Sequence, residues 1–153
     1  GVFFVKPGSY KIGRLRLEGV LTPHDRVGGR RYGFATAWQW EQAGLNFVHL
    51  GGSAVPLKPQ DKFLFGRPDV LVIGVGGGGK VFNGQEAAAV VNDLKPKIVI
   101  PVQYVKGSTP RNCDQNGIQP FLDSMKGVKV NNVGRRLILP SKIPNKIQIN
   151  LMD

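Results

Sequence analysis

Residues 69–104, DVLVIGVGGGGKVFNGQEAAAVVNDLKPKIVIPVQY, contain the clearest secondary-structure pattern of the chain. Two apolar runs predict strands at 70–75 and 97–102, because such runs are typical of strands buried on both faces of a sheet. Between them, Asn83 and Glu86 have the spacing of a helix-capping pair, and the apolar positions of the following turns share one face up to Leu94. Lys95-Pro96 ends this helix. The strand–helix–strand order predicts a β-α-β unit in an α/β fold.

Shorter elements flank this unit on both sides. Upstream, we expect strands at 14–18, 34–40 and 45–50, and a loop with one helical turn between 51 and 68. The alternation in 34–40 places Phe34, Thr36, Trp38 and Trp40 on one face. Downstream, the sequence predicts a helix at 118–125 and strands at 128–130, 136–139 and 146–151. The polar–apolar alternation of 146–151 suits an edge strand.

Length and composition predict one soluble globular domain spanning residues 1–153. No apolar run reaches the roughly 18 residues of a membrane span, and the N-terminus has no signal-peptide pattern. The chain does not begin with methionine, so we expect a processed product or a piece of a longer protein. Cys113 is the only cysteine, which excludes an internal disulfide and favours a cytoplasmic location.

The charge is strongly basic, with 21 Lys and Arg against 10 Asp and Glu and a net charge of +11. Such a balance allows binding to nucleic acid, an anionic membrane surface or an acidic partner. The alternative is a solvated basic surface, because the charges are spread along the chain without a run of five like charges. We therefore keep a nucleic-acid-binding module as an alternative function.

The glycine run from Gly74 to Lys80 has the G-x-x-x-x-G-K spacing of a phosphate-binding loop. Two features argue against nucleotide binding. Val81 stands where Mg²⁺ coordination needs a hydroxyl, and the helix begins near Gly84, too late to direct its N-terminus at a phosphate. We expect a structural or site-lining loop instead.

The pair His24-Asp25 follows a predicted strand. A histidine and an aspartate at a strand end can bind a metal or transfer protons. The alternative is a surface turn in which Asp25 accepts hydrogen bonds from the backbone.

In the order of its motifs the chain resembles the C-terminal part of metallo-β-lactamase-fold hydrolases of the UlaG-like type. The matching segments are, in order, Pro7-Gly8-Ser9-Tyr10, His24-Asp25 with Gly28, Arg31 and Gly33, Gly44-Leu45 with His49-Leu50-Gly51-Gly52, Asp69-Val70-Leu71, Gly74-Val75-Gly76-Gly77, Glu86-Ala87, and Lys95-Pro96-Lys97-Ile98-Val99-Ile100-Pro101-Val102-Gln103-Tyr104. Together they cover residues 7–104, about two thirds of the chain.

The resemblance also implies a metal site from which this chain departs. Gly52 stands where the family has a metal-bridging acid, and Gln103 replaces a histidine ligand. The upstream H-x-H-x-D-H cluster is absent. His24 and Asp25 remain as candidate metal ligands, whereas the resemblance makes His49 structural. Other residues are expected only to line the site: Gly76, Gly77 and Tyr104.

For the fold, the resemblance implies an αββα sandwich of two similar halves, of which this chain holds mainly the second: a mixed sheet with helices on one face. The inner face would then be covered by the N-terminal half or by a second copy. We expect Trp38, Trp40 and Phe47 at that seam, unless loops of this chain cover them.

The leading functional hypothesis is a non-catalytic, degenerate module with a structural or interaction role, without a cofactor. The alternative is a zinc-dependent hydrolase, using zinc or another divalent metal, that needs an upstream ligand segment.

Overall fold

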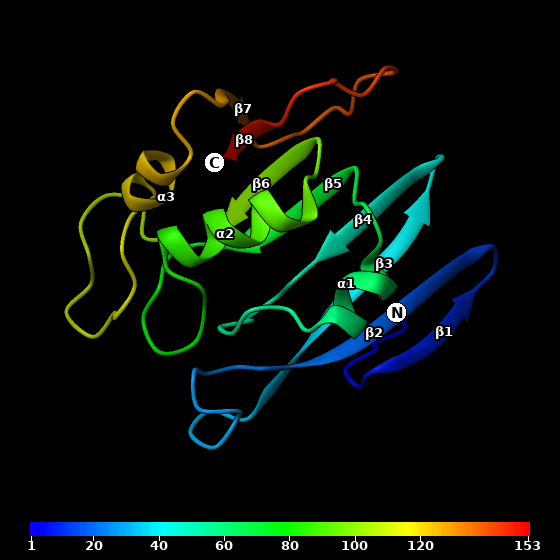
Figure 1. The fold of residues 1–153 in the computed structure, drawn as a ribbon, viewed down its shortest axis with the longest axis horizontal. Helices are drawn as coiled ribbons and strands as arrows, with labels where there is room; N and C mark the ends of the chain where they lie inside the picture. The colour runs from blue at the N-terminus through cyan, green and yellow to red at the C-terminus, as the bar shows by residue number, and fades with distance from the viewer.

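The computed structural model describes residues 1–153 and shows one eight-stranded mixed sheet with three helices (Figure 1). The sheet order is β1-β2-β3-β4-β5-β6-β8-β7. The strands are β1 (Gly8–Ile12), β2 (Leu15–Pro23), β3 (Phe34–Gln42), β4 (Leu45–His49), β5 (Val70–Gly74), β6 (Ile98–Val102), β7 (Lys129–Gly134) and β8 (Gln148–Met152). This architecture confirms the predicted mixed sheet of an α/β fold.

The sheet changes character along its width. Strands β1 to β4 pair antiparallel, and the remaining pairs, from β4–β5 to β8–β7, are parallel. The β3–β4 hairpin turns at Ala43 and Gly44, whose φ angles of 53° and 75° are those of a tight two-residue turn. The parallel crossovers need longer connections, and helices supply two of them.

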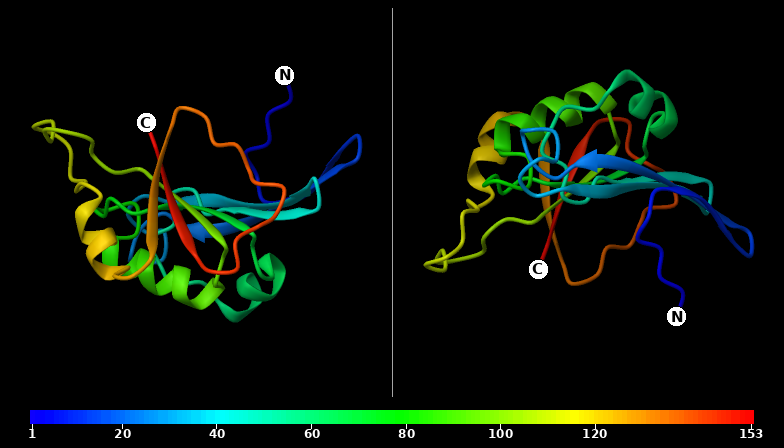
Figure 2. Two further views of the ribbon diagram at one scale, coloured as in Figure 1. Left: turned by 90° about the horizontal axis from the view of Figure 1, so that it is seen from above. Right: turned by 90° about the horizontal axis from the view of Figure 1, so that it is seen from below.

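The helices are α1 (Pro59–Phe65), α2 (Gly84–Leu94) and α3 (Gln119–Ser124). The predicted capping pair of α2 is confirmed: Asn83 Oδ1 accepts from the Glu86 N–H at 2.8 Å, and Glu86 Oε1 accepts from the Asn83 N–H at 3.0 Å. All three helices lie on one face of the sheet, as predicted (Figure 2). None of them is long and apolar enough to cross a bilayer.

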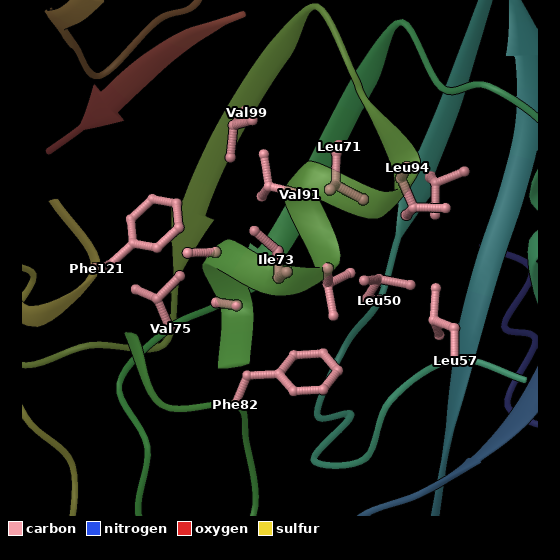
Figure 3. Close-up of a cluster of buried hydrophobic side chains, with 14 of the residues drawn as sticks. Leu50, Leu57, Leu71, Ile73, Val75, Phe82, Val91, Leu94, Val99 and Phe121 are labelled. Atoms are coloured by element: carbon pink, nitrogen blue, oxygen red, sulfur yellow. The ribbon is translucent and has the colours of Figure 1, made fainter. Parts of the chain in front are cut away.

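The core lies between the helices and the sheet (Figure 3). Leu71 and Ile73 of β5 and Val99 of β6 are fully buried there. Val91 and Leu94 of α2 pack onto them from the other side. Burial of one strand face against helices is the main stabilising contribution in such a fold.

The opposite face carries no helix, and we call it the open face. Strand pairing gives two rows of side chains on it. The first row is Tyr10, Leu17, Trp40, Phe47, Val70 and Ile98, and the second is Gly19, Trp38, His49, Val72 and Ile100. Neither row contains a side chain that is charged by default at neutral pH. Residues 1–7 and the connection between β7 and β8 extend on this side of the sheet (Figure 2).

Three expectations about the strands were wrong. The chain already forms a strand at Gly8–Ile12, where the sequence predicted none, because these residues pair with β2. Residues 136–139 form no strand, since this segment leaves the sheet between β7 and β8. Finally, β8 is not an edge strand, because β7 pairs along its outer side.

Candidate functional site at the carboxyl edge of the sheet

The predicted site residues gather at one edge of the sheet. Strands β4, β5 and β6 are parallel, and β2 runs in the same direction because two antiparallel pairs separate it from β4. The loops after these four strands therefore meet at their carboxyl ends, where ligands bind in open α/β sheets. They carry His24, Gly52, the glycine run and Gln103.

His24 is folded against Gly52. Its Nδ1 lies 2.6 Å from the Gly52 carbonyl oxygen. A Cβ atom added to Gly52 would lie 2.2 Å from His24 Cε1, far inside contact distance. An acidic residue at position 52 would thus require the His24 ring to move. In this chain the two positions form a hydrogen-bonded pair.

Asp25 organises the loop after β2. It is 2% exposed, and its two carboxylate oxygens accept four backbone N–H groups, two each, at 2.7–2.9 Å. Those donors belong to Val27, Gly29, Arg31 and Tyr32. Burial by itself would raise the pKa of Asp25, but these hydrogen bonds lower it to about 2. The carboxylate stabilises a backbone turn, which is the alternative stated for it from the sequence.

Arg26 connects this loop to the glycine run and to α2. Its guanidinium donates to the carbonyl oxygens of Gly78 at 2.5 Å and Val81 at 2.8 Å. It also forms a two-pronged ion pair with Glu86, at 2.7 and 3.2 Å. Burial raises the pKa of Glu86, but the bonds from Arg26 and the Asn83 N–H together hold it below its ordinary value.

The glycine run is held by bonds within the chain. The Gly77 N–H donates to the Phe82 carbonyl at 2.8 Å, and the Gly79 N–H donates to Asp114 Oδ2 at 2.8 Å. The Gly76 carbonyl accepts from the Asn116 N–H at 2.7 Å. A phosphate-binding loop directs its amides outward at the ligand. Two amides of this run are already paired, which agrees with a structural loop.

Gln103 lies beside the first glycines of the run. Its φ angle is 53°, and its side chain is exposed. A Cβ on Gly74 would lie 2.6 Å from Gln103 Oε1, and a Cβ on Gly76 would lie 2.1 Å from the Gln103 carbonyl oxygen. Gly76 therefore permits a close approach of two backbones. The next residue, Tyr104, is partly buried against the core, and burial together with the charge of Asp153 raises its pKa.

His49 lies on the open face, away from the His24–Gly52 pair. Its Nδ1 accepts from the Gly51 N–H at 3.0 Å. Burial lowers its pKa below the ordinary value of 6.5. With Phe4, Leu17, Trp38 and Trp40 it lines a hollow of about 270 Å³.

The structure brings the predicted ligand positions together only in pairs. His24 contacts Gly52, Gln103 contacts Gly74 and Gly76, and no hydrogen bond joins the two pairs. No group of three or more His, Cys, Asp or Glu side chains could hold a metal ion. The donors that this chain provides, one imidazole, one amide and a fully hydrogen-bonded carboxylate, do not fit a zinc site by themselves.

The sequence did not reveal the residues whose hydrogen bonds hold the loops of the carboxyl edge together. The sequence predicted Glu86 only as a helix cap, and it predicted no role for Arg26, Asp114 or Asn116. Glu86 offered one signal, since a capping carboxylate has a second oxygen free for a cation. The bonds from Asp114 and Asn116 span 35 and 40 residues, and no local pattern encodes them.

Comparison with known proteins identifies the family of this chain. A sequence profile described as the β-lactamase superfamily domain matches residues 2–103. Curated protein sequences gave no match. A solved structure from Thermotoga maritima, described in its name as a candidate Zn-dependent hydrolase of the metallo-β-lactamase superfamily, superposes with a TM-score of 0.80 at 25% identity, covering 96% of this chain and 69% of the other.

Two further solved structures share the fold. The metallo-β-lactamase-fold protein YhfI from Bacillus subtilis has a TM-score of 0.61 at 10% identity, over 99% of this chain and 52% of its own. A protein from Parabacteroides distasonis, named as a candidate metal-dependent hydrolase, has a TM-score of 0.61 at 17% identity, over 99% of this chain and 57% of its own. The chain thus spans little more than half the length of these two structures.

Proposed function

Because the chain belongs to the β-lactamase superfamily domain family, we propose that it is a non-catalytic module of the metallo-β-lactamase fold that acts by association through its open face. The observation that carries this proposal is the composition of that face. Both rows of side chains on β1 to β6 are uncharged, and they include Trp38 and Trp40, the only tryptophans of the chain. Apolar surfaces of this kind mark interfaces.

The occupant of this face would be a second polypeptide layer, either the N-terminal half of the fold or a second copy. On the opposite face of the same strands, charged side chains face solvent. They include Arg16 and Glu18 on β2 and Glu41 on β3. The antiparallel end of the sheet is therefore polar on its helix side and aromatic on the open face, which supports burial of the open face.

The chemistry of the carboxyl edge supports the non-catalytic part of the proposal. A hydrolytic zinc needs about three protein ligands and a bound water. Here Asp25 uses both oxygens on four backbone donors, and His24 is bonded to the Gly52 carbonyl. If a metal were bound at this edge, His24 and Gln103 would be the side chains to hold it, and further ligands would have to come from elsewhere.

A zinc-dependent hydrolase is the second candidate. It is favoured by the similarity to the Thermotoga maritima protein, which is described as a candidate Zn-dependent hydrolase. This chain spans 69% of that structure, so the remaining length could supply the missing ligands. The assignment to the UlaG-like type within the superfamily also remains a proposal.

Metal content separates the two candidates. The purified chain would be incubated with excess ZnCl₂, passed through gel filtration and analysed by inductively coupled plasma mass spectrometry. We expect well below one zinc per chain. The variant Gly52→Asp/Gln103→His, which restores the family residues, is the matched comparison and should retain more zinc than the wild type. One or two zinc ions retained by the wild-type chain would contradict the non-catalytic proposal.

The exposure of the open face is tested separately with an apolar dye, anilinonaphthalene sulfonate. We expect the isolated chain to bind it and Trp38→Gln/Trp40→Gln to lose most of the fluorescence. Phe63→Gln is the control, because Phe63 lies on α1, on the helix side of the sheet, and is 91% exposed. Equal loss in both variants would show that the dye does not report on the open face.

A further inference from the structure

We propose that the polypeptide covering the open face is acidic: an apolar strand surface bordered by Asp and Glu side chains. This inference rests on the proposed association through the open face and adds the chemistry of the partner. It is carried by the basic residues of the connection between β7 and β8, which extends on the helix-free side of the sheet (Figure 2).

The centre of the open face is apolar and shaped to receive a side chain. Trp38 and Trp40 are next-but-one neighbours on β3, with Leu17 of β2 and His49 of β4 beside them. These residues line the hollow of about 270 Å³, and Phe4 completes its wall. Such a hollow is large enough for one bulky apolar side chain, which is how interface anchors are bound.

The N-terminal segment of the chain contacts part of this face. The Phe4 ring lies 4.3 Å from that of Tyr10. The Val5 carbonyl accepts from the Thr36 hydroxyl at 3.2 Å, and the Lys6 carbonyl accepts from the Tyr10 hydroxyl at 2.8 Å. The face therefore combines aromatic surface with hydroxyl donors that match backbone carbonyls.

The segments that border the open face are basic and contain no acidic residue. The connection between β7 and β8, residues 135–147, has four cations and no carboxylate: Arg135, Arg136, Lys142 and Lys146. In residues 1–7, which run over Tyr10, the only charged side chain is the cation Lys6, because Lys11 and Arg16 pair on the helix side of the sheet. Both segments reach over the helix-free side of the sheet (Figure 2).

These cations have no ion-pair partners within the chain. The two ion pairs present, Arg26–Glu86 and Lys62–Asp93, involve helices α1 and α2 or the carboxyl edge. The basic border of the open face is therefore unneutralised, and an acidic partner would complement it.

The charge also decides between the occupants. Two copies face to face would each bring a net charge of +11 and place the same basic segments against each other. Like charges opposed across an interface disfavour association. A nucleic acid would match the border, but its bases need free aromatic faces for stacking, and the Trp40 ring is already stacked on Phe47 at 5.2 Å. An acidic polypeptide matches both the centre and the border.

The two tryptophans make the proposal directly measurable, because both lie on the open face. The probes are two synthetic β-hairpin peptides with the same Val/Phe face and either Glu or Lys at the flanking positions. At low salt we expect the Glu hairpin to shift the tryptophan emission to shorter wavelength and to bind at least about tenfold more tightly than the Lys hairpin. In 0.5 M NaCl the difference should shrink severalfold, because salt screens exposed charges.

Charge-reversal variants locate the effect. Arg135→Glu/Arg136→Glu should remove most of the preference for the Glu hairpin. Arg67→Glu/Lys95→Glu changes the net charge equally, at exposed positions that border β5 and α2 rather than the open face, and should keep the preference. Equal loss in both variants would mean that only the net charge matters, and the proposal would be wrong.

Other outcomes would also overturn it. Equal binding of the two hairpins would leave an apolar interface without charge selection. A dimer in sedimentation equilibrium, with the tryptophans already shielded, would assign the face to a second copy. An emission shift with oligo-dT but with neither hairpin would assign it to nucleic acid. None of these outcomes depends on zinc retention, so failure here is distinguishable from failure of the non-catalytic proposal.

Discussion

The two faces of the sheet are formed by the same strands, but this chain covers them to different extents. On the helix side, Leu71 and Ile73 of β5 are 0% exposed, and α2 covers them. On the open face of the same strand, Val70 is buried but Val72 is partly exposed, and no helix lies above them. A β-strand presents two surfaces, and here the helices cover only one of them.

At the carboxyl edge, as on the helix side, the chain itself provides the partners of its buried groups. Asp25 and Arg26 together make eight hydrogen bonds to backbone and side-chain groups of this edge. No buried side-chain nitrogen or oxygen lacks a partner anywhere in the chain. The polar requirements of the fold are therefore met internally, and what remains open is apolar. This difference predicts where substitutions destabilise the chain and where they mainly affect association.

The largest expected effect is a loss of stability from a substitution in the core between the helices and the sheet. Ile73→Ala should lower the free energy of unfolding by about 3–5 kcal/mol, because it opens a cavity in a fully buried core. Ile100→Ala removes the same atoms from the open face, where the side chain is partly exposed, and should cost about 1–2 kcal/mol. Urea denaturation followed by circular dichroism measures both. Equal costs would mean that the open face is as well packed as the helix side.

A smaller effect is expected at the carboxyl edge. Asp25→Asn removes a negative charge that four N–H groups stabilise and should lower Tm by roughly 5 °C at pH 7. The pKa of Asp25 is about 2 in the folded chain against an ordinary 3.8. Its contribution is therefore complete above about pH 4 and is lost as pH falls towards 2, so the variant and the wild type should converge in acid.

The control for this carboxylate is Asp123→Asn. Asp123 is exposed on α3, and its side chain accepts only from Gln119. We expect its Tm to stay within about 1–2 °C of the wild type at pH 7. A comparable loss in both variants would show that net charge, and not the turn after β2, sets the stability.

The sequence predicts the sheet and helices of this fold well where the signal is local. The apolar runs of β5 and β6 and the Asn83–Glu86 pair are short-range patterns, and the structure confirms them. The strand β1 was missed because Gly8 and Lys11 have little strand propensity, and pairing with β2 determines it. The apolar pattern of residues 136–139 predicted a strand, but these residues form none because no neighbouring strand pairs with them.

The candidate site was less predictable than the fold. The family motifs placed His24, Gly52 and Gln103 at one edge, but only coordinates show that His24 folds onto Gly52. The two readings of Asp25 stayed open in the sequence, because a carboxylate that binds metal and one that binds backbone N–H groups look alike. Contacts over dozens of residues decide between them.

The contact between His24 and Gly52 at the carboxyl edge can be tested by substitutions at both residues. Gly52→Ala should destabilise the chain by about 1–2 kcal/mol, because the new Cβ would lie 2.2 Å from His24 Cε1. His24→Ala removes the obstructing ring, so Gly52→Ala should cost about 1 kcal/mol less in that background. A double-mutant cycle in urea measures the coupling. Additive effects would contradict the contact.

The smallest expected effect lies on the open face, at His49. Burial lowers its pKa in the folded chain below the ordinary value of 6.5, so the unfolded chain takes up this proton first. Stability should therefore be complete above pH 6.5 and fall as pH decreases below that value. His49→Gln should flatten this part of the curve between pH 7 and 5. His24→Ala is the control, since it changes the only other histidine and leaves the slope of His49 in place.

A partner bound to the open face should enlarge the pH dependence that His49 causes. His49 pairs with Trp38 beneath the proposed interface, so covering the open face desolvates its ring further. Protonation then opposes binding, and the Glu-flanked hairpin should bind more weakly at pH 5.5 than at pH 7.5 in the wild type. His49→Gln should bind it equally at both pH values. A pH dependence that survives in His49→Gln would place the bound hairpin away from the open face.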